Sequence, residues 1–178
     1  MGTSSDNADS ALTVNNYGGD ISIYADGIAV TNAANDHGIE VTATAGTTLV
    51  EATDVRVNGA MDNGVNATGS ASATVTLNID ELDVQNTGSD GLHAEYATLT
   101  LSSSTLANNA GSGARLIEGD TTISDTSFND NAAYGLECEG AGVQACATVL
   151  HSANALGEQL GCDATCGEEA EDDDTGTP

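Results

Sequence analysis

A period of 22 residues constrains this chain more than any other feature of its sequence. Residues 79–94, 101–116 and 123–138 share one design. An apolar residue opens each copy, a second apolar residue follows five positions later, an Asn or Asp two positions after that, and a Gly seven positions after the second apolar residue. These positions hold Ile79, Leu101 and Ile123; Val84, Leu106 and Phe128; Asn86, Asn108 and Asp130; and Gly91, Gly113 and Gly135. A fixed period of this length indicates stacked supersecondary units.

Within each copy the apolar residues alternate with polar ones, as in Leu99 and Leu101 or Leu136 and Cys138. Alternation is typical of strands, and the intervening Ser, Thr, Asn, Asp and Gly residues are typical of turns. The one proline is Pro178, so every repeat keeps its backbone donors. The sequence therefore predicts an all-β fold, a single-stranded right-handed parallel β-helix of about five to six coils.

The phase of the alternation around the repeated Gly predicts which side chains are buried. We expect a core that contains Leu92, Leu101, Leu106, Leu116, Ile123, Phe128 and Leu136. We expect His93, Arg115 and Glu137 to be exposed, because they occupy the opposite phase.

The Asn and Gly positions of the repeat carry further expectations. Equivalent side chains in successive coils lie roughly 4.8 Å apart, so stacked amides can donate to one neighbour and accept from the other. This predicts a ladder at Asn86, Asn108 and Asp130. The repeated Gly is expected at a tight corner with a positive φ.

The sequence divides into four parts. We expect a flexible segment at residues 1–10, the β-helix at 11–150, a cysteine-containing cap at 151–167 and a disordered acidic tail or linker at 168–178. The repeated Gly residues are spaced by 26 and 27 residues in the early coils and by 22 later. The extra residues are expected in turns, where solenoids often build binding sites; harmless drift in length is the alternative.

The segment Phe128-Asn129-Asp130-Asn131 matches a known motif. The repeat resembles the right-handed β-helix of the pectate-lyase-like superfamily, and this segment is similar to the FxxN motif of polymorphic outer-membrane proteins and related autotransporter passengers. Their companion Gly-Gly motif is absent, since Gly113 and Gly135 stand singly. The resemblance covers about residues 11–150 and implies the fold, whereas lyases, hydrolases, adhesins and structural spikes all share it.

The chain is strongly acidic. It has 28 Asp and Glu residues and only two basic residues, Arg56 and Arg115, which gives a net charge of −26. Such a surface disfavours nucleic acid and anionic lipid as partners and favours cations, basic proteins or high salt. No run of residues reaches the roughly 18 apolar positions of a membrane span. The first residues do not read as a signal peptide, so we expect the chain to be part of a longer secreted or cell-surface protein.

One polar position follows each repeated Gly and points outward. It holds Glu40, Asn66, His93, Arg115 and Glu137 in successive coils. In the resembling enzymes the active site lies on the outer face of a parallel sheet. That makes His93, Arg115, Glu137 and Glu40 the catalytic candidates, as base, acid and charge stabiliser. The alternative is a solvated face with paired charges, and the absence of Lys, common in the lyase sites, favours it.

Three aspartates, Asp36, Asp62 and Asp90, stand one or two positions before the repeated Gly in consecutive coils. Carboxylates and turn carbonyls are ligands that Ca²⁺ prefers, so these residues are a candidate calcium site. Ordinary Asp turn chemistry is the alternative. The Gly-rich calcium nonapeptide of β-rolls is missing.

All four cysteines lie near the C-terminus, at Cys138, Cys146, Cys162 and Cys166. Their spacing does not match a zinc finger, so we expect two disulfides, an extracytoplasmic location and no free thiol. Cys138–Cys146 with Cys162–Cys166 is the first expectation. Cys138–Cys162 is the alternative, because a separation of 24 is close to one coil.

These patterns predict a secreted or cell-surface module with a structural or adhesive role, which binds glycan, protein or cations. The alternative is a polysaccharide lyase or glycoside hydrolase with its site on the outer face of one parallel sheet. Two carboxyl groups about 5–10 Å apart on such a face would favour the hydrolase.

Overall fold

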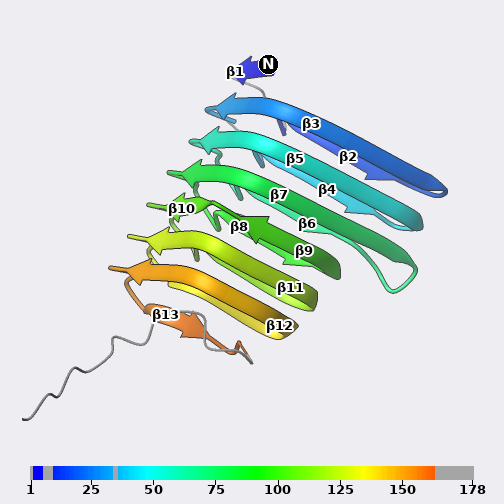
Figure 1. The fold of residues 1–178 in the computed structure, drawn as a ribbon. Coiled ribbons are helices and arrows are strands. Elements are labelled where there is room, and N and C mark those ends of the chain that lie inside the picture. The colour runs from blue at the N-terminus through cyan, green and yellow to red at the C-terminus, as the bar shows by residue number, and fades with distance from the viewer. Residues whose placement is uncertain (1, 6–9, 34–35, 163–178) are drawn as a thin grey trace, which may run out of the picture.

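The computed structural model describes residues 2–5, 10–33 and 36–162, and these residues form strands and turns without a helix. Parallel strands stack as a β-solenoid of about six turns (Figure 1). The strands are β1 (Gly2–Ser5), β2 (Leu12–Asn16), β3 (Asp20–Thr31), β4 (Ile39–Ala43), β5 (Gly46–Asn58), β6 (Val65–Thr68), β7 (Ala73–Gln85), β8 (Leu92–Glu95), β9 (Ala97–Ser102), β10 (Thr105–Ala107), β11 (Ala114–Asn129), β12 (Tyr134–Ser152) and β13 (Gly157–Leu160). The predicted fold class is confirmed.

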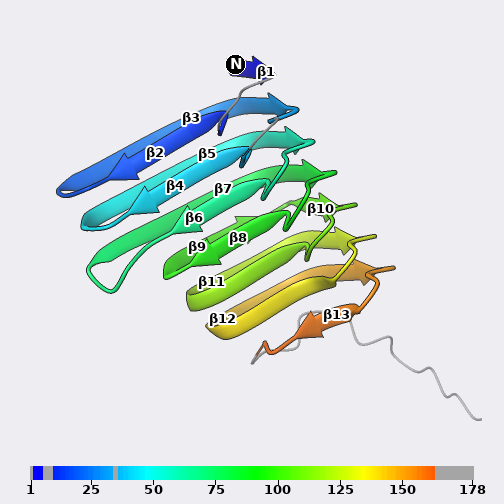
Figure 2. The ribbon, with the colours of Figure 1, turned by 180° about the vertical axis from the view of Figure 1, so that it is seen from behind.

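The solenoid has three faces, each a sheet of parallel strands, and every turn contributes to them. We name these faces A, B and C. Face A contains β2, β4, β6, β8, the starts of β11 and β12, and β13. Face B contains the first parts of β3, β5 and β7, then β9 and the middles of β11 and β12. Face C contains β1, the last parts of β3, β5 and β7, then β10 and the ends of β11 and β12 (Figure 2).

The core is the narrow stack of side chains between these faces. All seven residues expected there are at most 1% exposed, namely Leu92, Leu101, Leu106, Leu116, Ile123, Phe128 and Leu136. His93, Arg115 and Glu137 lie in the opposite phase, as predicted. They are partly buried where exposure was predicted: their side chains are 17%, 38% and 25% exposed, because neighbours in adjacent coils cover part of each.

The predicted ladder exists, but it lies one residue later than expected. Asn86, Asn108 and Asp130 have φ angles of 57°, 57° and 55° and are exposed, so they form the corner and their side chains face solvent. The left-handed conformation suits Asn and Asp, which adopt it more readily than other residues with a Cβ. The residue after each corner then points inward. These inward residues are Thr87, Asn109, Asn131 and, after Ala153, Asn154.

Asn131 is the centre of the observed ladder and is 1% exposed. Its Oδ1 accepts hydrogen bonds from the backbone N and Nδ2 of Asn109, at 3.1 and 3.0 Å. Its Nδ2 donates to Oδ1 of Asn154 at 2.9 Å and to the carbonyl of Leu106 at 3.1 Å. One side chain therefore links three successive coils.

The repeated Gly residues are needed for close approach, and the prediction of a positive φ is wrong for them. Gly91 and Gly113 are absent from the left-handed region that the neighbouring corners occupy. A Cβ on Gly91 would lie 2.6 Å from the carbonyl oxygen of Gly113, closer than carbon and oxygen can pack. The same holds at Gly38, Gly64, Gly113 and Gly135, so this position admits no side chain in the five coils that carry the repeated Gly.

The early coils are longer than the later ones mainly at the corner between faces A and B. Val75 pairs with Ala97, whereas Gly69 donates to Glu95, so residues 70–74 have no counterpart in the next coil. The extra residues form the turn after Gly69 and also lengthen the strands of face B, which contradicts their assignment to turns alone (Figure 1). Strand pairing also extends beyond residues 11–150, because β1 pairs with β3 and β13 pairs with β12.

The disulfide joins Cys138 to Cys162, so both expected local pairs, Cys138–Cys146 and Cys162–Cys166, are wrong and the alternative is confirmed. The register explains it: Glu137 pairs with Leu160, which brings the residues just after β13 beside Cys138 on the next coil. The side chain of Cys146 and the whole of Cys166 lie outside the described residues, so their pairing stays a prediction.

Loss of this disulfide should destabilise the chain by about 3 kcal/mol, since it closes a loop of 24 residues in the unfolded state. The test compares urea unfolding of the wild type with the Cys138→Ala/Cys162→Ala variant. A reductant should shrink the difference between the two proteins. Equal midpoints under oxidising conditions would contradict the prediction.

Candidate functional site

The outward column predicted on face A is present. Strand register pairs Glu40 with Asn66, Asn66 with His93, His93 with Arg115, and Arg115 with Glu137. Adjacent members of such a column are separated by about 4.8 Å, the spacing between strands. His93, Arg115 and Glu137 are therefore direct neighbours, whereas Glu40 lies two coils from His93.

A second polar column runs along the turn between faces C and A and was not predicted. His37 Nδ1, Asn63 Oδ1, Asp90 Oδ1 and Ser112 Oγ each accept a hydrogen bond from the backbone N of the next coil. The four distances are 3.3, 3.0, 2.7 and 3.4 Å. The sequence carried the signal, because a side chain that can accept a hydrogen bond directly precedes the repeated Gly in each of these coils.

The two columns meet in a group that we name the face A cluster: Asp90, His93, Ser112, Arg115 and Glu137. Asp90 Oδ2 lies 3.6 Å from His93 Nδ1, and Arg115 Nε lies 3.6 Å from Glu137 Oε1. Ser112 Oγ donates to Glu137 Oε2 at 2.9 Å. The acidic, basic and hydroxyl groups of the cluster are thus largely directed at one another.

Partners outside the cluster extend this charge pairing. Arg115 Nη2 lies 3.6 Å from Glu139 Oε2, so two carboxylates flank one guanidinium. Glu40 instead accepts a hydrogen bond from Ser10 Oγ at 3.3 Å, near the other end of face A. The structure therefore brings together three of the four catalytic candidates and leaves Glu40 apart.

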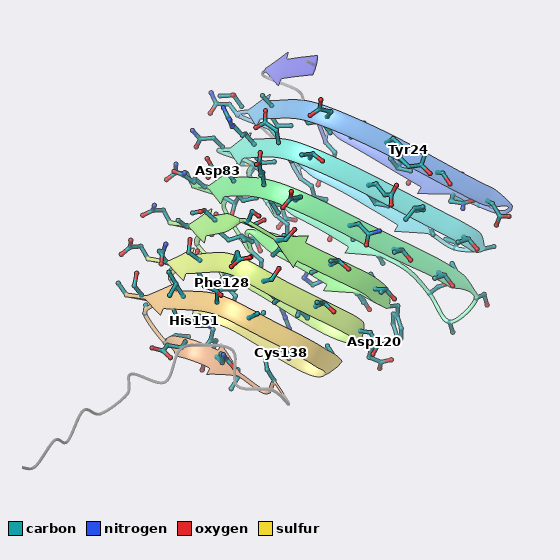
Figure 3. All side chains as sticks on the ribbon, viewed as in Figure 1. Tyr24, Asp83, Asp120, Phe128, Cys138 and His151 are labelled. Atoms are coloured by element: carbon teal, nitrogen blue, oxygen red, sulfur yellow. A yellow bond between two sulfur atoms is a disulfide. The ribbon has the colours of Figure 1, made fainter. Side chains whose placement is uncertain are left out.

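The other arginine marks a second charged feature, on face C. Arg56 Nη2 lies 2.9 Å from Asp54 Oδ1, and a shallow hollow there is lined by Asp54, Arg56, Glu81 and Asp83, among others. Figure 3 labels Asp83, near the end of β7. Arg56 pairs in register with Asp83 on the next coil. Acidic groups therefore surround both arginines of the chain.

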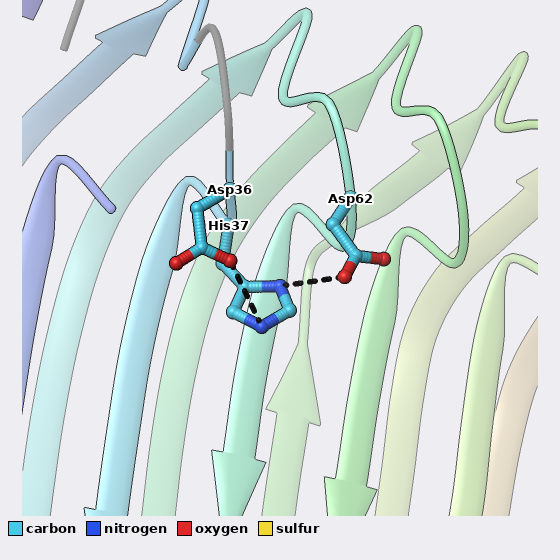
Figure 4. Close-up of side chains that lie close together, drawn as sticks. All are labelled: Asp36, His37 and Asp62. Atoms are coloured by element: carbon cyan, nitrogen blue, oxygen red, sulfur yellow. Dashed lines mark ion pairs between the residues drawn. The ribbon is translucent and has the colours of Figure 1, made fainter. Parts of the chain in front are cut away.

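The three aspartates of the candidate calcium site do not form one column. Two of them, Asp36 and Asp62, form a pair at the corner before face A, and Asp90 belongs to another column. Asp36, His37 and Asp62 each place one ligand atom within 4.8 Å of the others (Figure 4). Asp62 follows Asp36 in register, since its backbone N donates to the Asp36 carbonyl at 3.4 Å. Asp90 stands one position later in its turn, after Asn63 in the second column, and is only 7% exposed. The candidate calcium site is thereby reduced to Asp36 and Asp62, with His37 beside them.

The hydrogen bonding of His37 decides which ions suit this corner. Asn63 N donates to Nδ1, so Nδ1 carries a lone pair and the proton of the neutral ring is on Nε2. Nε2 lies 3.4 Å from Asp36 Oδ1, within reach of that carboxylate. A metal on Nε2 would move the proton to Nδ1, where it would meet the Asn63 N–H. The corner therefore favours a hard cation on the carboxylates of Asp36 and Asp62, which are 38% and 52% exposed.

Two pKa shifts occur away from these groups. The hydroxyl of Ser102, 2.7 Å away, is the main cause of the lowered pKa of Asp80 on face B. The negative charge of Glu118 raises the pKa of Tyr96 at the corner between faces A and B. Both groups are exposed to solvent, which weakens the consequence of each shift for stability.

The described residues include no helix that is long and apolar enough to cross a membrane. Comparison with family models, curated proteins and solved structures finds no match for this chain. The fold alone supports the resemblance stated from the sequence, and what it establishes is the architecture, a parallel β-solenoid of about six turns.

Proposed function

We propose that this chain is a rigid, acidic binding module of a secreted or cell-surface protein, with a structural or adhesive role toward glycan, protein or cations. Continuous backbone pairing and two side-chain columns hold every coil in register, so the outward side chains keep fixed positions. The net charge of −26 directs such a rod toward cations and basic surfaces.

The observation that carries this proposal is the carboxylate pair of Asp36 and Asp62 on adjacent coils. Ca²⁺ takes six to eight oxygen ligands, so two carboxylates leave several positions open. Glycan hydroxyls, protein carboxylates or water can fill those positions. A cation held at the corner would therefore serve as the contact between this surface and a partner.

A carbohydrate lyase or hydrolase has less support. Such an enzyme needs an acid and a base that are free to reach a substrate. In the face A cluster, His93 faces Asp90, and Glu137 is engaged by Ser112 and Arg115. These contacts support a paired, solvated face.

The proposed extracellular or cell-surface location is supported by the disulfide Cys138–Cys162. Disulfides form and persist in oxidising compartments and are rare in reducing ones. The acidic surface supports a location where salt or divalent cations are plentiful.

Calcium should stabilise the chain more than sodium or magnesium does at the same ionic strength. All salts should raise the melting temperature, because screening within a Debye length of about 8 Å weakens repulsion among the carboxylates. Calcium bound at Asp36 and Asp62 should add about 1.4 kcal/mol for each tenfold increase above its dissociation constant. Melting curves in matched NaCl, MgCl₂ and CaCl₂ measure this excess.

The matched variants are Asp62→Asn and Asp20→Asn, since each removes one exposed carboxylate charge. Asp62→Asn should abolish the calcium excess and keep the general salt effect, while Asp20→Asn keeps both. Identical shifts in all three salts would leave only screening and remove the calcium contact from the proposal.

A further inference from the structure

One tripeptide of the chain matches the acceptor sequence of N-linked glycosylation. Asn66-Ala67-Thr68 has the form Asn-x-Ser/Thr without a proline in the middle, and no other Asn of the sequence has Ser or Thr two positions later. The reaction modifies the carboxamide of the Asn and requires the hydroxyl of the third residue. A match of three residues is short, so the place of these residues in the fold decides whether the site can carry a glycan.

The fold presents both functional side chains of the tripeptide on the surface. The three residues belong to β6, the strand of face A in the third coil. Asn66 and Thr68 lie in the outward phase and are half-buried, while Ala67 between them points into the core and is 0% exposed. Side chains two positions apart on a strand share a face, so the carboxamide and the hydroxyl lie on the same outer surface. A glycan on Asn66 would therefore extend into solvent and leave the core intact.

The Asn66 side chain makes no contact that a glycan would have to break. Among the described residues, none forms a hydrogen bond or ion pair with its carboxamide. Its neighbours in the outward column are both engaged, since Glu40 accepts a hydrogen bond from Ser10 and His93 faces Asp90. Nδ2 of Asn66 is thus available for a covalent bond at no cost to the hydrogen bonding of the fold.

We infer that Asn66 is an N-glycosylation site, and the inference rests on the proposed secreted or cell-surface location, because the transferases for this reaction act on exported chains. Nδ2 forms a bond to C1 of the first sugar of a lipid-linked oligosaccharide. The bond between that C1 and a phosphate oxygen breaks, the lipid phosphate leaves, and one Nδ2 proton passes to a base of the transferase. The disulfide Cys138–Cys162 supports passage through an oxidising export compartment.

The glycan has to be attached before the third coil folds. A transferase must bind the backbone of the tripeptide as well as its two polar side chains. In the folded chain β6 lies between β4 and β8 and pairs with both of them, and Ala67 is fully buried (Figure 2). The acceptor tripeptide is therefore accessible to the transferase only in the unfolded chain.

A glycan at Asn66 would decide which surfaces remain for a partner. His93 of the face A cluster follows Asn66 in register on the next coil, about 4.8 Å away. An oligosaccharide is much larger than this spacing, so it would cover the neighbouring part of face A. It would bar a long polysaccharide from lying along that face and leave faces B and C open to a partner.

Mass spectrometry of the protein isolated from the cells that naturally produce it tests the inference. The chain has no Lys and only two Arg, Arg56 and Arg115, so trypsin releases residues 57–115 as one peptide that contains the tripeptide. We expect this peptide to carry the mass of a glycan, which fragmentation places on Asn66. Asn66→Gln and Thr68→Ala, made in the same cells, should both abolish the added mass. Thr68→Ser is the matched control and should keep it.

Two results would overturn the inference: an unmodified peptide, or a glycan that persists in Asn66→Gln and is therefore attached to a hydroxyl. Circular dichroism of the variants should show the strand signal of the wild type, which separates loss of the site from loss of the fold. Thiol labelling of Cys138 in the same sample separates the glycan from the proposed location. An unmodified peptide with Cys138 in its disulfide overturns the glycan alone, whereas a free thiol at Cys138 contradicts the secreted location as well.

Discussion

Replacing Phe128 with Ala is expected to lower the free energy of unfolding by about 3–5 kcal/mol. Phe128 is 0% exposed and is the largest fully buried side chain of the core. Its ring stacks on that of His151, with centroids 5.3 Å apart and an interplanar angle of 21°. The narrow core gives the neighbours little room to collapse into the cavity, because hydrogen-bonded strands hold them in place.

Urea unfolding followed by circular dichroism measures this loss. Tyr24→Ala is the matched control: Tyr24 is 71% exposed on face B, so its loss should change stability by no more than about 0.5 kcal/mol (Figure 3). A cost below about 1 kcal/mol for Phe128→Ala would mean that this part of the core is not tightly packed.

Replacing Asn131 with Ala is expected to cost roughly 3–5 kcal/mol, although the side chain is small. The change leaves the backbone N and Nδ2 of Asn109 without their acceptor. It also removes the donor to the carbonyl of Leu106 and to Asn154 Oδ1. Each buried polar group left unsatisfied costs about 1–3 kcal/mol, and the loss is shared between neighbouring coils.

The control for this variant is Asn129→Ala in the same coil. Asn129 Oδ1 accepts one exposed hydrogen bond from Ser152, so its removal should cost less than about 1 kcal/mol. Unfolding in urea compares both variants with the wild type. Equal costs for the two variants would show that water satisfies the ladder and that its burial does not matter.

The sequence predicted the core well because a two-residue period has only two phases. Once the repeated Gly set the phase, Leu92 and Leu136 had to face inward and His93 outward. The period also shows which residues are equivalent in successive coils. It does not show where a turn residue points, so the ladder was assigned to Asn108 when the left-handed corner turns the next residue, Asn109, inward.

The disulfide pairing and the placing of the aspartates both depend on the position of each residue within its coil. Cys138 is closer in sequence to Cys146, but one coil of separation places Cys162 beside it. Asp90 directly precedes its Gly, whereas Asp36 and Asp62 stand two positions before theirs. A shift of one residue moved Asp90 into a different column, and only the strand register reveals that shift.

The sequence places a possible acceptor at His37, directly before the repeated Gly, but it does not show which ring nitrogen accepts. The accepting nitrogen is the one that meets the backbone N of Asn63, a matter of side-chain orientation. The outward column on face A was easier to predict, because its members share the position after the repeated Gly. The contacts inside the face A cluster could not be predicted from this column alone, because they also involve Asp90 and Ser112 of the second column.

The column through His37, Asn63, Asp90 and Ser112 has a consequence for the length of the rod. Each side chain accepts a hydrogen bond from an N–H of the next coil, so the coils from His37 to Tyr134 meet through the same kind of bond in the same direction. Whole coils can be inserted or removed with each remaining acceptor still opposite a donor, whereas a single extra residue must be absorbed within its own coil, as the register shift between Thr121 and Thr122 absorbs one. The rod can therefore change its axial length during evolution only in steps of complete coils, and each step moves its two ends apart, or together, by about 4.8 Å.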